Sequence, residues 1–216
     1  MKTSFSAMKK QTQRGFTLVE IAIVLVIIGL LIGGILRGQE LITSARVRNL
    51  IDQKTAVQAS YYGFIDRFRM QPGDLTVAQA ALINNQATPA YNGPGDGWVV
   101  WQDSPQFFNN LAQSGFLSCA QCMTKATAAA GALNNTNSPT NVFGTPIWYE
   151  SQNGGQDNGS IFLTPVGVTE VTKPKLSTGN TISSQLLAEL DRKIDDSDPA
   201  RGQFRFSNWH WVASTG

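Results

Sequence analysis

The chain has 216 residues, of which 42% are apolar, and it contains 17 basic and 15 acidic residues, a net charge of +2. This length and apolar content fit one sizeable domain plus a short additional segment. Residues 1–15 hold four of the basic residues and none of the acidic ones, so the rest has 13 basic against 15 acidic residues and a net charge of −2. Bulk charge therefore gives no support to a general nucleic-acid-binding role, and no nucleic-acid partner is predicted.

An apolar run at residues 16–36 follows these basic residues. It contains a single charged residue, Glu20, and has roughly the 20 residues that a helix needs to cross a bilayer. The run is longer than the apolar part of a secretory signal peptide, so a transmembrane pass is predicted. The basic residues before it favour a cytoplasmic N-terminus with the C-terminal bulk outside, although Arg37 just past the run argues weakly against this orientation.

The junction before the run has a specific pattern. Four basic residues are followed by Gly-Phe-Thr-Leu-Val-Glu and then by the apolar residues: Lys2, Lys9, Lys10 and Arg14 come first, and Gly15 to Glu20 follow. This stretch resembles the prepilin signature of type IV pilins and type II secretion pseudopilins. The resemblance implies that a prepilin peptidase removes residues 1–15 by cleaving between Gly15 and Phe16 on the cytoplasmic side, and that the new Phe16 amine is methylated.

A carboxylate within a membrane-length run is costly and usually marks a function. Cleavage would create an amine at Phe16, with a pKa of about 7.7–8.0 for a free α-amino group, one helical turn before Glu20. In a filament Glu20 of one subunit can pair with the Phe16 ammonium of a neighbour and so set the axial register. Two alternatives are that Glu20 pairs with the Phe16 terminus of its own helix, and that it reaches water at the headgroup level.

The helical pattern continues past residue 36. Apolar residues recur at three- and four-residue spacing, interrupted by Lys54: Val47, Leu50, Ile51, Val57, Tyr61, Phe64, Ile65 and Phe68. Pro72 is the first proline, so a helix is predicted over residues 16–70, with residues 37–70 packed against a head formed by residues 71–216. Gly33 and Gly34 are either a point of local melting or small residues that allow close helix packing.

The expected fold class is α+β and pilin-like: the long helix lies on a small antiparallel sheet with short extra helices. Three short helices are predicted. The first is capped by Asp74 or Thr76 and runs to Ile83; the second runs from Ser104 to Leu111 and stops by Gly115; the third is capped by Thr181 or Ser183 and runs to Ile194.

The predicted strands lie between these helices and at the C-terminus. Residues 146–149 and 161–163 are expected to form a hairpin joined by residues 152–159, and residues 98–101 a strand or buried segment. Two further strands are expected at residues 166–171, on an edge, and at residues 203–212, with a bulge. Residues 123–145 are rich in Ala, Asn and Thr and are expected to form a surface loop.

Cys119 and Cys122 form a Cys-x-x-Cys pair. In a cytosolic protein this spacing would suggest redox chemistry or zinc. The chain has no second pair and its one histidine, His210, is distant, whereas structural zinc needs four ligands. In an oxidising extracytoplasmic compartment we expect a local disulfide, with free thiols or an intermolecular bond as alternatives.

Three carboxylates, Asp195, Asp196 and Asp198, follow the end of a predicted helix, where they repel one another and the helix dipole. Turn hydrogen bonds and ion pairs with Arg192, Lys193 or Arg201 are the favoured compensation, and calcium is the weaker alternative, since the spacing is not that of an EF-hand loop. Asp96 is expected to lie in a solvated turn. No cofactor is otherwise expected.

The resemblance implies a structural subunit, a major or minor pilin, of a type IV pilus-like filament. Such a subunit lies in the bacterial inner membrane and then assembles with copies of itself or related pilins into an extracellular or periplasmic filament, using a pilus or secretion machinery. A type II secretion pseudopilin is the alternative, which the turn-rich head disfavours. A signal-anchored periplasmic enzyme or binding protein is a remote alternative: with one histidine and no Gly-x-Ser-x-Gly motif, the sequence provides no evident nucleophile and base.

Overall fold

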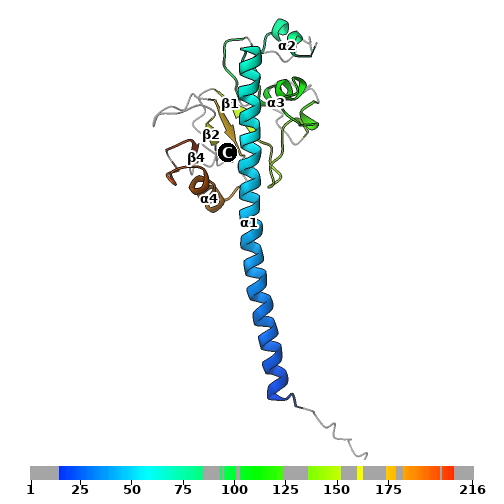
Figure 1. Ribbon diagram of the computed structural model, residues 1–216, viewed down its shortest axis with the longest axis vertical. Helices are drawn as coiled ribbons and strands as arrows, with labels where there is room; N and C mark the ends of the chain where they lie inside the picture. Colours follow the sequence, from blue (N-terminus) through cyan, green and yellow to red (C-terminus); the bar gives the residue numbers. More distant parts are fainter. Residues whose placement is uncertain are drawn as a thin grey trace, which may run out of the picture. The chain divides into compact units, whose positions relative to one another are not determined.

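The computed structural model describes residues 15–84, 93, 95–100, 103–123, 136–151, 160–162, 174–178, 182–199 and 201–206. The chain divides into two compact units, Met1–Ser44 and Ala45–Gly216, which are called the N-terminal unit and the head below. Most of the helices and strands are labelled in Figure 1.

Helix α1, Leu18–Phe68, begins in the N-terminal unit and ends in the head. It is two residues shorter at each end than the predicted 16–70. Thr17 caps its first turn, and Arg69 adopts a left-handed backbone conformation (φ 56°) just before Pro72. Within the head it buries one stripe: Val47, Leu50, Lys54, Val57, Ser60, Tyr61 and Phe64. The structure therefore confirms the long helix and its amphipathic second half.

The short helices agree with the sequence pattern. Helix α2, Val77–Asn84, follows a capping box in which the Thr76 backbone N–H donates to Gln79 Oε1 (2.9 Å). Helix α3, Ser104–Gln113, has a proline in its first turn, and Gly115 with φ +80° follows its end. Helix α4, Ser184–Ile194, is capped by Ser183, whose side chain accepts from Leu186 N–H. A 3₁₀ turn, η3, covers Gln121–Met123.

The sheet has four short antiparallel strands in the order β1-β3-β2-β4. They are β1 Trp148–Glu150, β2 Ser160–Phe162, β3 Lys175–Ser177 and β4 Phe204–Arg205. Tyr149 is opposite Leu176, which in turn is opposite Ile161, and Ile161 is opposite Phe204. The α+β class with a small antiparallel sheet is thus confirmed.

The predicted hairpin is wrong, because β3 lies between β1 and β2 and pairs with both. Strand β3 has the sequence Lys-Leu-Ser. Because two of its three residues are polar, it was not predicted from the apolar runs of the sequence. Its Lys175 is buried and its Nζ lies 3.2 Å from Glu150 Oε1, so the charge is neutralised by the residue opposite it on β1.

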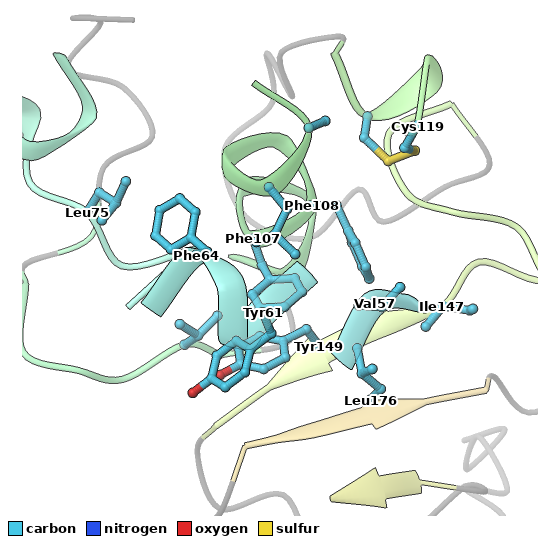
Figure 2. Packing of buried hydrophobic residues seen from close by; sticks show 14 of the residues in the cluster. Val57, Tyr61, Phe64, Leu75, Phe107, Phe108, Cys119, Ile147, Tyr149 and Leu176 are labelled. Carbon is cyan, nitrogen blue, oxygen red and sulfur yellow. A yellow bond between two sulfur atoms is a disulfide. The ribbon is translucent and has the colours of Figure 1, made fainter. Parts of the chain in front are cut away.

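Two apolar clusters join α1 to the rest of the head. In the first, the Phe107 ring of α3 stacks on the Tyr149 ring of β1, with centroids 3.7 Å apart, and Tyr61 of α1 lies next to both (Figure 2). In the second, Leu50 of α1 packs with Phe204 of β4 and with the buried face of α4. One face of the head sheet is therefore covered by the second half of α1.

Lys54 lies between these clusters and is fully buried. Its Nζ donates to the Leu176 carbonyl (3.1 Å) and lies 5.3 Å from the centre of the Phe204 ring. Burial lowers the pKa of Lys54 well below its usual range.

Residues 136–145 do not form the expected surface loop, since Asn137, Ser138 and Asn141 are buried. The Asn141 side chain accepts a hydrogen bond from Phe143 N–H (2.8 Å) and donates one to the Thr178 carbonyl (2.7 Å). It therefore links this segment to the residue that follows β3. Residues 98–100 are not a strand, although Val99 is buried and exchanges hydrogen bonds with Ser151. The strand expected at 166–171, the bulge after Phe206 and His210 lie outside the described residues.

Candidate functional site

The described part of the N-terminal unit exposes its large apolar side chains. Within the described part of the chain these side chains are exposed from Phe16, which is 84% exposed, to Ile42. The others are Leu18, Val19, Ile21, Ile23, Val24, Leu25, Val26, Ile27, Ile28, Leu30, Leu31, Ile32, Ile35, Leu36 and Leu41. Among the described residues, α1 is the one helix long and apolar enough to cross a membrane, and its most apolar window is entirely unburied. Such a surface needs lipid or another protein to cover it.

Glu20 is held by its own helix terminus. Its Oε2 accepts a hydrogen bond from the Thr17 backbone N–H (2.9 Å) and one from the Thr17 hydroxyl (2.8 Å), while the Glu20 N–H donates to Thr17 Oγ1 (3.3 Å). This is a capping box, in which the residue before the helix and the residue three positions later satisfy each other's backbone groups. Thr17 and Glu20 together therefore start α1.

The capping box identifies the hydrogen-bond partner of the Glu20 carboxylate in the single chain, which the charge pattern of the sequence left open. The sequence interpretation considered the Phe16 terminus, water or a neighbouring chain as partners of Glu20, and overlooked Thr17. The signal was present, because Thr-x-x-Glu before an apolar run is typical of a helix start. In the single chain the carboxylate is therefore hydrogen-bonded without any second subunit.

Gly15 and Phe16 precede α1 outside any regular secondary structure, and both residues are exposed. Among the described residues, no atom beyond the chain neighbours of Gly15 lies within 4 Å of the position that a Cβ on Gly15 would take. The Gly15–Phe16 peptide bond is therefore open to another protein.

Two charged residues of α1 follow the apolar run at residues 16–36. Arg37 Nη1 and Glu40 Oε2 form an exposed ion pair at 2.9 Å, one turn apart on α1. Between this pair and Glu20, the positions of Gly29, Gly33 and Gly34 have open space beside the helix, and α1 remains helical through all three. These glycines leave room for a close approach by another helix.

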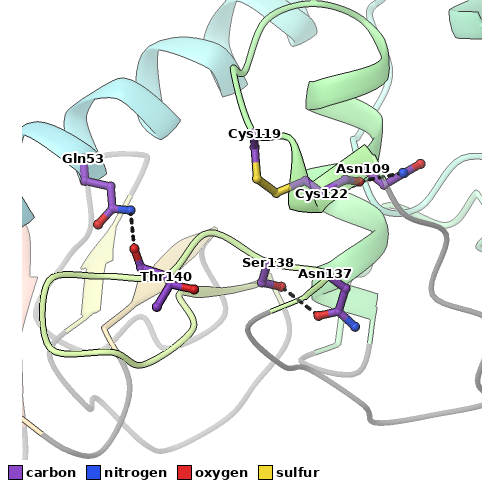
Figure 3. The surroundings of a disulfide bond; sticks show 7 residues. All are labelled: Gln53, Asn109, Cys119, Cys122, Asn137, Ser138 and Thr140. Carbon is purple, nitrogen blue, oxygen red and sulfur yellow. Dashed lines mark hydrogen bonds between the residues drawn. A yellow bond between two sulfur atoms is a disulfide. The ribbon is translucent and has the colours of Figure 1, made fainter.

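In the head, a disulfide joins Cys119 and Cys122, whose Cα atoms are 5.2 Å apart (Figure 3). Both cysteines belong to the first apolar cluster. The adjacent Asn109 of α3 donates through Nδ2 to the Cys122 carbonyl (2.8 Å). The bond therefore closes the turn that follows α3.

The acidic residues after α4 separate into two groups. Asp198 Oδ2 lies 3.5 Å from Arg201 Nε. Asp195 and Asp196 instead lie near Asp191 of α4, with one ligand oxygen from each of the three within 4.8 Å of the others. Asp191 was overlooked in the sequence, although it lies one helical turn before Asp195, whose backbone N–H donates to the Asp191 carbonyl at the end of α4. Burial, and then the negative charges of Asp196, Asp195 and Asp198, raise the pKa of Asp191.

The Gly-rich turn at residues 93–97 is held by a buried acid. Asp74 accepts from Gly95 N–H (3.0 Å) and from Gly97 N–H (2.6 Å), so it fixes this turn, while Thr76 caps α2. Asp96 is exposed and accepts from Trp98 N–H (2.9 Å), as expected of a turn residue.

Comparison with protein-family models matches residues 10–36 to the prokaryotic N-terminal methylation motif. No curated protein and no solved structure shows significant similarity to the chain. The matched residues are the prepilin motif of type IV pilins and pseudopilins, so the resemblance found in the sequence is confirmed. The motif includes Gly15, Phe16 and Glu20, together with most of the exposed apolar surface described above.

Proposed function

We propose that this chain, a type IV pilin-like or pseudopilin-type protein by its N-terminal motif, is a structural subunit of a type IV pilus-like filament. The observation that carries the proposal is the first part of α1, which is apolar on all sides and has no covering residue within the described chain. Proteins with this motif have structural rather than catalytic roles.

The first step is processing at the membrane, which the motif implies. Prepilin peptidase cleaves the Gly15–Phe16 bond, whose two residues are exposed, and the new Phe16 amine is methylated. The processed subunit stays in the inner membrane through residues 16–36, with the head on the extracytoplasmic side. Roughly 20 apolar residues are enough to hold it there.

The second step is assembly through the same apolar surface. Lipid tails are as apolar as the helix, so the hydrophobic effect does not by itself favour leaving the membrane for another helix. Close packing and charge pairing make contact with another subunit's helix more favourable than contact with lipid. In the free subunit Glu20 is satisfied by Thr17; in the filament Glu20 pairs with the Phe16 ammonium of a neighbour. The exchange of a neutral partner for a cation selects one axial register, because an unpaired charge in that environment is costly.

One contact of this kind, repeated with a rotation that does not close, builds a helical filament. The assembled form is an extracellular pilus built from copies of this chain or related pilins. The sequence of the head is long and rich in turn residues, which favours a pilus over a secretion pseudopilus.

The test is mass spectrometry of the purified protein together with electron microscopy of the sheared cell-surface fraction. We expect a first residue of Phe16 bearing one extra methyl group, and fibres that disappear on deletion of the gene. A membrane-bound protein that still begins at Met1 would contradict processing. Fibres that persist after deletion, together with loss of protein secretion, would reassign the subunit to a pseudopilus.

A further inference from the structure

Trp98 follows the Gly-rich turn of the head and exposes a large part of its side chain. It is 46% exposed, and within the described part of the chain its indole N–H has no hydrogen-bond partner. Tryptophan combines a large apolar ring with one hydrogen-bond donor. Trp98 therefore presents both an apolar ring and a free donor at the surface.

The backbone on both sides of Trp98 is fixed. On one side, the Gly97 N–H donates to the buried carboxylate of Asp74 (2.6 Å). On the other side, Val99 is buried, its N–H donates to Ser151 Oγ and its carbonyl accepts from Ser151 N–H, each at 2.8 Å. A single exposed apolar side chain is common, but one whose two neighbours are anchored is held in place before any ligand binds, which lowers the cost of binding.

The turn beside Trp98 adds open space and polar groups. Among the described residues, no atom beyond its chain neighbours lies within 4 Å of the position that a Cβ on Gly97 would take. Asp96 is exposed, and its Oδ1 accepts from Trp98 N–H (2.9 Å), whereas its Oδ2 has no partner in the same part of the chain. Gln79 Oε1 lies 4.0 Å from the Cβ position of Gly95 and belongs to the capping box of α2, and the amide NH₂ of Gln79 has no partner among the described residues.

The charge of this part of the chain restricts the class of ligand. Residues 70–124 contain no Lys, Arg or His. Nucleic acids and anionic lipid headgroups are bound through cationic side chains, so the surface does not suit them. An organic cation would fit the ring of Trp98 and the carboxylate of Asp96, but it accepts no hydrogen bond from the indole N–H or from the Gln79 amide.

We infer that Trp98, Asp96 and Gln79 form a binding surface for a neutral polysaccharide. A β-linked pyranose has one face of C–H groups, which packs on an aromatic ring, and hydroxyl groups that both donate and accept hydrogen bonds. Its hydroxyls donate to the carboxylate of Asp96 in a charge-assisted bond and accept from the indole N–H and the Gln79 amide. The open space at Gly97 leaves room for a sugar ring beside Trp98.

The surface lies in the head, so the apolar part of α1 is not involved in binding. In the filament proposed above the surface would repeat with each subunit, so that weak single-site binding adds up to firm attachment. This consequence rests on the proposed function, whereas the binding surface itself does not.

Nuclear magnetic resonance of the full-length chain, labelled with ¹⁵N-tryptophan and held in a polyoxyethylene detergent without sugar groups, tests this assignment. The chain has five tryptophans, and the signal that disappears in Trp98→Phe assigns the indole N–H of Trp98. The probes are cellohexaose and chitohexaose, two neutral β-linked oligosaccharides, with choline chloride as the cationic comparison. We expect a saturable shift of the Trp98 signal with at least one hexaose and none with choline.

Isothermal titration with the hexaose that binds then measures the variants. Trp98→Ala should weaken binding at least about 5-fold, the lower end of what loss of one stacking ring costs, and Trp98→Phe, which keeps a ring, should bind more tightly than Trp98→Ala. Tyr62→Ala is the matched control, because the Tyr62 side chain is 45% exposed on α1 outside the turn, and its affinity should not change.

The absence of a saturable shift with both hexaoses would overturn the proposal. Unchanged affinity in Trp98→Ala would overturn it equally, as would binding of choline without either sugar. Trp98 is exposed, so its variants are expected to fold. The titrations use single subunits, so their failure and that of the proposed function are distinguishable.

Discussion

The two parts of helix α1 differ in what surrounds them. In the N-terminal unit, large apolar side chains are exposed on every side of the helix. In the head, the buried residues follow one stripe, including Val47, Leu50 and Phe64, while Arg48 and Asp66 are exposed on the remaining surface. One continuous helix thus has an all-round apolar part and an amphipathic part.

The difference shows how the distribution of side chains, rather than the secondary structure, decides what a helix contacts. An amphipathic helix buries its stripe against its own chain and keeps its charges in water. A helix that is apolar all round has no face for water, and α1 has no covering residue in its first part within the described chain. Its partner must therefore be lipid or other chains.

The largest expected effect is the loss of filaments on Glu20→Ala. The apolar run is unchanged, so the protein should remain in the membrane fraction, but the acid that pairs with a neighbour's Phe16 is gone. Fibres are counted by electron microscopy and the membrane pool by immunoblotting. Glu40→Ala is the matched control, because Glu40 is an exposed acid on the same helix that already pairs with Arg37. Normal fibres from Glu20→Ala would remove Glu20 from assembly.

The same Leu→Ala substitution in the two parts of α1 is expected to change the free energy of unfolding by different amounts. Leu50 is 0% exposed and Leu25 is 64% exposed. We expect Leu50→Ala to lower the free energy of unfolding of the head by about 2–5 kcal/mol, and Leu25→Ala to change it by less than about 0.5 kcal/mol. Urea unfolding of the full-length chain in detergent, followed by tryptophan fluorescence, measures both. Equal losses would mean that the head also depends on the first part of the helix.

A smaller effect is expected on the pH dependence of stability. Because burial lowers the pKa of Lys54 below its usual value of 10.5, the unfolded chain binds more protons than the folded chain between the two values. Stability therefore rises with pH across that window and is lost as pH falls through it. Lys54→Met should flatten this slope, measured as the unfolding free energy at a series of pH values. An unchanged slope would assign the pH dependence to other groups.

The smallest expected effect concerns the start of α1. Thr17→Ala removes the hydroxyl of the capping box, and loss of such a cap typically raises local opening by about 5-fold. Amide hydrogen exchange of the first helical turn should accelerate by that factor, while Thr17→Ser, which keeps the hydroxyl, should exchange like the unmodified chain. Acceleration in Thr17→Ser as well would show that the hydroxyl is not the stabilising group.

The sequence predicted the helices well because their signals are local. Phe68 lies shortly before Pro72, and Ser183 precedes the periodic pattern of α4, so a cap or a breaker bounds each helix. The prepilin motif is likewise a contiguous pattern. The apolar run therefore indicated the exposed surface without knowledge of the head.

Contacts between distant residues were not predictable in this way. Strand β3 is polar in sequence, and its buried Lys175 pairs with Glu150 of another strand. Asp191 looks like an ordinary helix-surface acid, because its burial depends on how α4 packs on the sheet. Such residues are identified only when segments far apart in the chain are brought together.

The most direct test of the central claim is photo-crosslinking from Leu25, replaced by a photoreactive amino acid, in cells that express the chain. Leu25 lies within the exposed apolar surface of the N-terminal unit. The account predicts a ladder of covalent multimers that is lost in the Glu20→Ala background. Monomers alone, with adducts only to lipid, would show that membrane rather than neighbouring subunits covers this helix, and would contradict assembly through it.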